Sequence, residues 1–209
     1  DSRKPVVETG TLSDDQHRRD FTVNSMAVDI HPDRYGDLYD PFGGIADLSN
    51  GVLRTPLDPI STFEDDPLRI IRAARFACQL GFIIDPITFT GMKDRADRIS
   101  IVSPERITVE LEKIMLCPVP SVGFNWLYEC GVLHQFFPDL VALQGVETQE
   151  GVRHKDNFFH TLKVVDNLVE SVADRDPTET LWLRWAALLH DIGKPKSKRF
   201  TEGVGWSFH

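Results

Sequence analysis

The most informative pattern in the 209-residue chain is a row of three arginines that follows a carboxylate. Arg69, Arg72 and Arg75 are spaced by three, and Asp66 stands three residues before the first of them. On an α-helix, residues three apart lie about 60° apart around the axis, so the four charges would follow one side. The other side would carry aliphatic and small residues that suit packing: Ile70, Ile71, Ala74, Ala77 and Cys78.

The charged side has two interpretations. One is an exposed helix surface with an ion pair between Asp66 and Arg69. The other is a recognition surface, because residues 57–92 contain no lysine and all their cations are arginines. A guanidinium forms paired hydrogen bonds with phosphates and with the edges of bases, which an ammonium does not.

A carboxylate beside a guanidinium can read the Watson–Crick edge of a base. Cytosine and adenine offer an amino donor to the carboxylate and a ring-nitrogen acceptor to the guanidinium. Uracil and guanine offer a carbonyl and a ring N–H at those places, and each mismatched buried group costs about 1–3 kcal/mol. Asp66 with Arg69 therefore predicts selection of C and A over U and G.

A second pattern with chemical potential lies further along the chain. His190 and Asp191 end an apolar run that has helical spacing, and Gly193 and Pro195 stop it. His160 opens an earlier helical segment. Imidazole and carboxylate ligands suit Mn, Fe, Ni, Zn or Mg. The alternative is a histidine that is simply satisfied at a helix end.

Helical spacing dominates after Pro56 and must position both patterns. Pro67 suits the first turn of the arginine helix, Gly81 its C-cap, and Ser103 with Pro104 the start of another helix. We predict helices over residues 66–80, 86–97, 104–116, 120–130, 158–173 and 179–191.

The N-terminal part is mixed. Residues 1–17 predict a loop in which Asp14 and Asp15 are solvated, and residues 21–30 fit a strand or a short helix. Short strands at 36–39 and 51–54 would flank a turn at 40–44 and a helical stretch at 44–48. The fold class is α+β and predominantly α-helical.

The composition is that of a soluble globular protein, with 41% hydrophobic and 26% charged residues. No apolar run approaches the ~18 residues of a membrane span, and no secretory signal is visible, so we expect a cytoplasmic protein without membrane contact. Three cysteines without paired spacing predict buried, reduced thiols: Cys78, Cys117 and Cys130. The net charge of −9 means that RNA contacts must come from a few placed cations.

Four segments, in order, resemble motifs of the class II tRNA nucleotidyltransferases and the related bacterial poly(A) polymerases. Residues 18–27 (RRDFTVNSMA) resemble the motif for the sugar and triphosphate of the incoming nucleotide, and residues 40–48 (DPFGGIADL) a flexible link between head and neck. Residues 65–76 (DDPLRIIRAARF) resemble the base-reading motif, with Asp65 in place of the usual Glu. Residues 103–111 (SPERITVEL) resemble the motif that braces the neck helices.

The resemblance assigns nucleotide-binding roles residue by residue. It implies that Asp66 and Arg69 read the base of CTP or ATP, and that tRNA is the partner. By the same carry-over, three residues would contact the ribose and phosphates and two more would lie near the nucleotide: Arg19, Asp20 and Asn24, then Arg72 and Arg75. The family's DxD carboxylates, which hold Mg²⁺ for nucleotidyl transfer, would precede residue 1, so no catalytic residue is assigned. We therefore expect a fragment that is inactive in nucleotide addition by itself.

The C-terminal segment resembles the HD superfamily. The resemblance makes His160, His190 and Asp191 ligands of a divalent metal whose identity stays open, with His209 and His154 as further candidates. It implies either phosphohydrolase activity or a structural role.

These patterns together predict three parts. Residues 1–56 would form the C-terminal part of a nucleotidyltransferase head, 57–145 a helical neck that binds nucleotide and RNA, and 146–209 the start of an all-α HD domain. The predicted function is CCA addition to the 3′ end of tRNA. The alternatives are a poly(A) polymerase that uses ATP alone, a metal-dependent HD phosphohydrolase with a remnant head, and a non-catalytic RNA-binding module.

Overall fold

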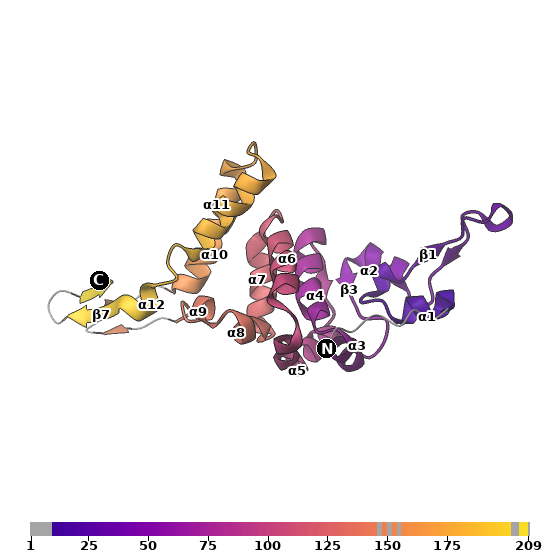
Figure 1. The fold of residues 1–209 in the computed structure, drawn as a ribbon, viewed down its shortest axis with the longest axis horizontal. Coiled ribbons are helices and arrows are strands. Elements are labelled where there is room, and N and C mark those ends of the chain that lie inside the picture. The colour runs from indigo at the N-terminus through magenta and orange to yellow at the C-terminus, as the bar shows by residue number, and fades with distance from the viewer. Residues whose placement is uncertain (1–9, 146–147, 150–151, 154–155, 202–204, 209) are drawn as a thin grey trace.

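The computed structural model describes residues 10–145, 148–149, 152–153, 156–201 and 205–208. The chain is elongated, with the N-terminal segment at one end, a group of helices in the middle and two long helices beyond them (Figure 1). The predicted class, α+β and predominantly helical, is confirmed. Among the described residues, none of the helices has both the length and the apolar character that a membrane crossing requires.

The N-terminal segment begins with helix α1 (Leu12–His17), where a loop was predicted. The Thr11 hydroxyl accepts from the backbone N–H of Asp14, and the Asp14 carboxylate accepts from the backbone N–H of Thr11 at 2.8 Å. This reciprocal capping box starts the helix, with Asp in the place usually taken by Glu. The loop prediction for residues 12–17 was therefore wrong.

Short strands and a helix complete this segment. A 3-10 turn at Thr22–Asn24 precedes β1 (Ala27–Val28), which pairs antiparallel with β2 (Leu38–Tyr39). Helix α2 (Gly44–Asn50) begins where the Asp40 carboxylate accepts from the N–H groups of Gly44 and Ile45 at 2.6 and 3.0 Å. Strand β3 (Val52–Leu53) pairs in parallel with β4 (Ile83–Ile84), which ties this segment to the central helices. The strands predicted near 36–39 and 51–54 are present.

The central part is helical, and α4 packs against α6 and α7 (Figure 1). Their contact is apolar and fully buried, through residues such as Ile70, Ile114 and Phe124. The helices are α3 (Pro59–Asp65), α4 (Leu68–Leu80), α5 (Pro86–Asp94), α6 (Pro104–Met115), α7 (Pro120–Glu129), α8 (Val132–Phe136) and α9 (Pro138–Val141), with a 3-10 helix at Ala96–Ile101.

The arginine helix starts later than predicted. Asp66 has an extended backbone (φ −144°, ψ 98°) and lies outside α4, because a residue before proline avoids the helical region. Pro67 accordingly occupies the N-cap position instead of the first turn. At the other end, Gly81 caps α4 with φ 69°, as predicted. The sequence also missed α3, and α5 ends at Asp94 instead of residue 97.

Helices α10 (Asn157–Ser171) and α11 (Pro177–Leu189) pack against each other beyond the central helices (Figure 1). A short helix, α12 (Lys194–Ser197), leads to an antiparallel pair of strands that was not predicted, β7 (Lys198–Thr201) and β8 (Gly205–Phe208). A further antiparallel pair, β5 (Thr148–Gln149) and β6 (Val152–Arg153), precedes α10.

Two charged side chains, the buried Arg184 and the partly buried Asp166, join α11 and α10 to the central helices. The Arg184 guanidinium of α11 donates to the carbonyls of Met115 and Cys117 at the C-terminal end of α6. The Asp166 carboxylate of α10 accepts from the backbone N–H of Ser121 at the start of α7, at 3.0 Å. Each charge thus meets the helix end of opposite partial charge.

Candidate nucleotide and metal sites

Asp20, from the N-terminal segment, is buried against α4. Its Oδ2 lies 2.8 and 2.7 Å from two guanidinium nitrogens of Arg72. Its Oδ1 accepts from the side chain of Asn24 and the backbone N–H of Phe21, both at 3.0 Å. The structure thus brings together three residues that the sequence assigned to one site, and both Asp20 oxygens are already occupied by donors.

Glu110 of helix α6 lies close to two arginines of the neighbouring helix α4. Its buried carboxylate lies 2.6 Å from Arg75 Nε, 2.8 Å from Lys113 Nζ and 3.9 Å from Arg72 Nη1. A buried carboxylate needs such compensation, since an unpaired charge in the interior is costly. The exposed-surface interpretation is therefore wrong for Arg75, which is buried, and for the partly buried Arg72.

Aromatic rings reinforce the same junction. Phe21 is fully buried and meets Phe76 of α4 edge-on, with 5.8 Å between ring centroids. The Arg75 guanidinium lies over the Phe76 ring at 3.8 Å. The segments at 18–27 and 65–76 therefore contact each other through both charge and apolar packing.

Asp66 and Arg69 have different partners from those that a helical wheel predicts. Asp66 Oδ2 pairs with Arg106 at 2.9 Å, and its Oδ1 accepts from the N–H of Leu68 at 3.2 Å. The Arg69 guanidinium donates to the backbone carbonyls of Thr62 and Arg18. In the described part of the chain, no contact joins the Asp66 carboxylate to the Arg69 guanidinium. The expected ion pair on one helix side is thus replaced by two separately held groups at the same helix start.

Arg19 is the most exposed of the predicted nucleotide contacts. Its guanidinium pairs with Asp15 of α1 at 2.6 Å, and both side chains are about half exposed. Exposed pairs of this kind contribute little to stability and exchange readily with other partners. Asp15 was predicted as solvated, and it is partly so.

Arg106 and Glu110 are the functional candidates that residue-type reasoning did not assign individually. Both lie in the 103–111 segment, whose resemblance implied only a bracing role. Their i, i+4 spacing on α6 was the available signal, because it places both on one helix side, facing α4. What the spacing could not show is that Arg106 reaches across to Asp66.

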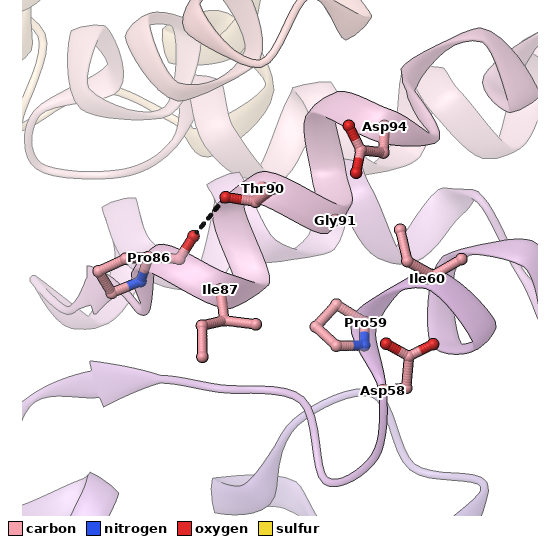
Figure 2. A pocket seen from close by; sticks show the side chains of 8 residues that line it. All are labelled: Asp58, Pro59, Ile60, Pro86, Ile87, Thr90, Gly91 and Asp94. Atoms are coloured by element: carbon pink, nitrogen blue, oxygen red, sulfur yellow. Dashed lines mark hydrogen bonds between the residues drawn. The ribbon is translucent and has the colours of Figure 1, made fainter.

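A separate apolar groove of approximately 300 Å³ lies between α3 and α5, with Asp58 and Asp94 at its edge (Figure 2). Gly91 is required there, since an added Cβ would lie 2.5 Å from the Cβ of Pro59. None of the predicted site residues lines this groove, so it is distinct from the charged junction.

The predicted metal ligands do lie together. One ligand atom each from His160, His190 and Asp191 falls within 4.8 Å of the others. His190 Nδ1 contacts the Ala187 carbonyl at 2.7 Å, which places its proton there and leaves the lone pair on Nε2. Nε2 then faces an oxygen of the buried Asp191 at 3.2 Å.

Two acceptor atoms this close favour a cation beside them, so the donor set fits a divalent metal. Lys194 Nζ already contacts the same Asp191 oxygen at 2.6 Å and supplies part of that positive charge. His154 and His209, the further candidates, lie outside the described residues.

Family models match three stretches of the chain. Residues 1–54 match the poly A polymerase head domain, residues 81–143 the probable RNA and SrmB-binding site of polymerase A, and residues 157–206 the HD domain. The chain belongs to the class II tRNA nucleotidyltransferase and poly(A) polymerase family with an HD domain.

Individual relatives agree with this membership. A multifunctional CCA protein from Vibrio parahaemolyticus is 38% identical over 190 residues, which cover 88% of this chain and 44% of the relative. The Bacillus stearothermophilus CCA-adding enzyme, solved in complex with CTP, is 29% identical with a TM-score of 0.64, covering 90% of this chain and 42% of that one. The Thermotoga maritima CCA-adding enzyme, solved with tRNA, is 28% identical with a TM-score of 0.65, covering 85% and 41%. The chain thus spans less than half the length of these relatives.

Proposed function

We propose that this protein is a tRNA nucleotidyltransferase that adds CCA to the 3′ end of tRNA from CTP and ATP. The observation that carries the proposal is a group of charged contacts gathered at one junction. Residues 18–20, 66–75 and 106–110, far apart in sequence, meet at the junction of the N-terminal segment with α4 and α6. The relatives that are CCA-adding enzymes support this reading over a poly(A) polymerase.

Among the residues at this junction, we assign base reading to Asp66 and Arg69. The Asp66 carboxylate accepts from the amino group of C or A, and Arg69 donates to the adjacent ring nitrogen. Arg106 holds the Asp66 carboxylate in place through its 2.9 Å contact. Uracil and guanine leave these groups mismatched, which accounts for their rejection.

The remaining residues position the nucleotide. Asp20 already accepts from Arg72 and Asn24, so its role is to orient those two donors, not to meet a phosphate itself. Arg19 is exposed and can exchange Asp15 for a phosphate oxygen. Mg²⁺ supplies charge neutralisation for the triphosphate and the leaving pyrophosphate, and we assign none of its ligands within this chain.

The test uses the full-length natural protein, not these 209 residues alone, and a tRNA that lacks its 3′ CCA. Labelled CTP and ATP are supplied with Mg²⁺, and products are resolved at single-nucleotide length. Addition of two C and one A supports the proposal; long runs of A assign a poly(A) polymerase instead, and no addition overturns both. In the same assay, Asp66→Ala should lose the selection of C and A over U and G. The control is Glu64→Ala, which removes an exposed carboxylate of α3 that pairs with Arg95, and it should keep that selection.

The cluster of His160, His190 and Asp191 supports a second activity, hydrolysis of phosphate esters at a divalent metal. When bound, such a metal activates water and neutralises phosphate. His160, His190 and Asp191 would hold it, and the Lys194 ammonium, 2.6 Å from Asp191, would place a positive charge beside the site for a phosphate. Metal-stimulated release of phosphate from a model ester or a cyclic phosphate, lost in Asp191→Asn, is the expected result. Hydrolysis that persists in this variant would leave the cluster with a structural role.

A further inference from the structure

A cavity of approximately 390 Å³ lies between the C-terminal parts of α4 and α6. Its polar walls are Arg75 and Gln79 of α4 and Lys113 of α6, and the rest of the lining is Leu116, Cys117 and Pro118. Among the described residues that line it, none is acidic. All three cysteines of the chain are buried and free, as predicted, so Cys117 adds no charge from a disulfide or metal partner.

The two cations of this cavity share one carboxylate. Glu110, buried on α6, lies 2.8 Å from Lys113 Nζ and 2.6 Å from Arg75 Nε. The contact with Arg75 has the length of an ion pair but not the alignment of a hydrogen bond. Because one carboxylate serves both cations, the cavity keeps a positive charge in a chain whose net charge is −9.

The polar groups of the walls are arranged as donors. An ammonium has three N–H donors, and the Lys113 side chain is 47% exposed beside its one contact with Glu110. Arg75 Nη1 donates to Gln79 Oε1 at 2.9 Å, which turns the NH₂ group of that amide away from the guanidinium. A ligand for these groups must therefore accept several hydrogen bonds and carry negative charge, as a phosphate group does.

The groove between α3 and α5 is of similar size but has the opposite character. Its edge carries the carboxylates of Asp58 and Asp94, and its other walls are mainly apolar (Figure 2). A phosphate would be repelled there. Hollow shape alone thus does not make a phosphate site, and the cavity beside Lys113 differs from the groove in the charges of its walls.

We propose that the cavity of Arg75, Gln79 and Lys113 binds a backbone phosphate of tRNA. The proposal rests on the proposed function, which supplies the RNA. Arg75 lies six residues after Arg69, about 9 Å further along α4. An RNA strand whose 3′ end reaches the base-reading residues can therefore also reach this cavity. Such a contact adds affinity by releasing counterions and fixes the position of the RNA without reading its sequence.

The first experiment measures how fast Lys113 is acetylated in the full-length natural protein. An amine-acylating reagent is applied with inorganic phosphate, with tRNA, or with chloride at the same ionic strength, and modified peptides are quantified by mass spectrometry. We expect the acetylation of Lys113 to fall by half or more with either ligand. Lys93 is the internal control for the phosphate sample, because it is exposed on α5 over the Phe89 ring and does not line the cavity.

The second experiment measures the affinity for tRNA over a range of salt concentrations. Lys113→Ala should reduce the slope of log K against log salt by about 0.7–0.9, the value of one phosphate contact. Gln79→Glu places a carboxylate in the wall while leaving Arg75 an acceptor, so the fold should be kept and binding should weaken by about two- to fivefold. Gln144→Glu is its matched control, since it adds the same charge at an exposed position after α9.

Each outcome decides the proposal. Protection of Lys113 by both ligands, together with the smaller salt slope, supports it. Protection by neither ligand, in a protein that binds tRNA, overturns it, and protection by inorganic phosphate alone assigns the cavity to free phosphate instead of tRNA. Failure of the proposed function is distinguishable, because the wild-type protein would then bind no tRNA at any salt concentration.

Discussion

Two guanidinium nitrogens of Arg72, on α4, lie 2.7 and 2.8 Å from the buried carboxylate of Asp20. The same guanidinium approaches Glu110 of α6 at 3.9 Å. One side chain therefore bridges the N-terminal segment and two central helices. The geometry makes Arg72 a positioning residue, because any movement of α4 relative to the N-terminal segment must break this pair.

Replacing Arg72 by alanine should destabilise the protein by about 1–3 kcal/mol, because two largely buried carboxylates lose a charged donor. The melting temperature of the intact protein measures this effect. Arg175→Ala is the matched control, because Arg175 pairs with Glu179 and both side chains are about half exposed, so little change is expected. Equal melting temperatures for all three proteins would contradict the bridging role.

Gly44 is a second point at which the N-terminal segment depends on close contact. A Cβ at this position would lie 2.4 Å from the Thr22 carbonyl oxygen and 2.9 Å from Met26 Cγ. Gly44→Ala should therefore cost about 1–3 kcal/mol through overpacking and move α2 away from residues 22–26. Thermal unfolding checks this, with Gly10→Ala as the control, since its added methyl meets only ordinary contacts.

The capping box of α1 predicts a pH-dependent contribution. Hydrogen bonds from the backbone and side chain of Thr11 lower the pKa of Asp14 below 3.8. A carboxyl with a lowered pKa in the folded state stabilises it above the unfolded value and loses that contribution as pH falls through the folded pKa. Asp14→Asn should thus melt below wild type from pH 7 to about 4, and the difference should shrink at lower pH. A difference that is constant with pH would exclude this linkage.

Local signals in the sequence predicted the long helices well. The Gly81 cap and the apolar period of α4 depend only on neighbouring residues, so the pattern was sufficient. The pairing of charges was not local. Pro67 forces Asp66 into extended backbone, which turns its carboxylate toward Arg106, forty positions later, instead of Arg69.

Arg106 offers the sharpest test of how the base is read. If its contact with Asp66 holds that carboxylate in place, Arg106→Ala should weaken discrimination between CTP and UTP by about 10-fold or more, the equivalent of losing one charged hydrogen bond. Incorporation of each nucleotide by the intact protein, as kcat/KM, measures the ratio. Arg106→Lys should restore part of it, because an ammonium keeps the charge but not the planar fork.

The control for this prediction is Arg98→Ala, which removes an exposed cation on the 3-10 helix at Ala96–Ile101. It should leave the ratio of CTP to UTP unchanged. A general loss of activity in Arg106→Ala with the ratio preserved would show that Arg106 only braces the helices. A wild-type protein that adds no nucleotide would instead refute the proposed function itself, so the two failures are distinguishable. Asp66 itself is the same in the wild type, in Arg106→Ala and in Arg106→Lys. If selectivity falls in the first variant and partly returns in the second, the orientation of the Asp66 carboxylate therefore contributes to the choice of base.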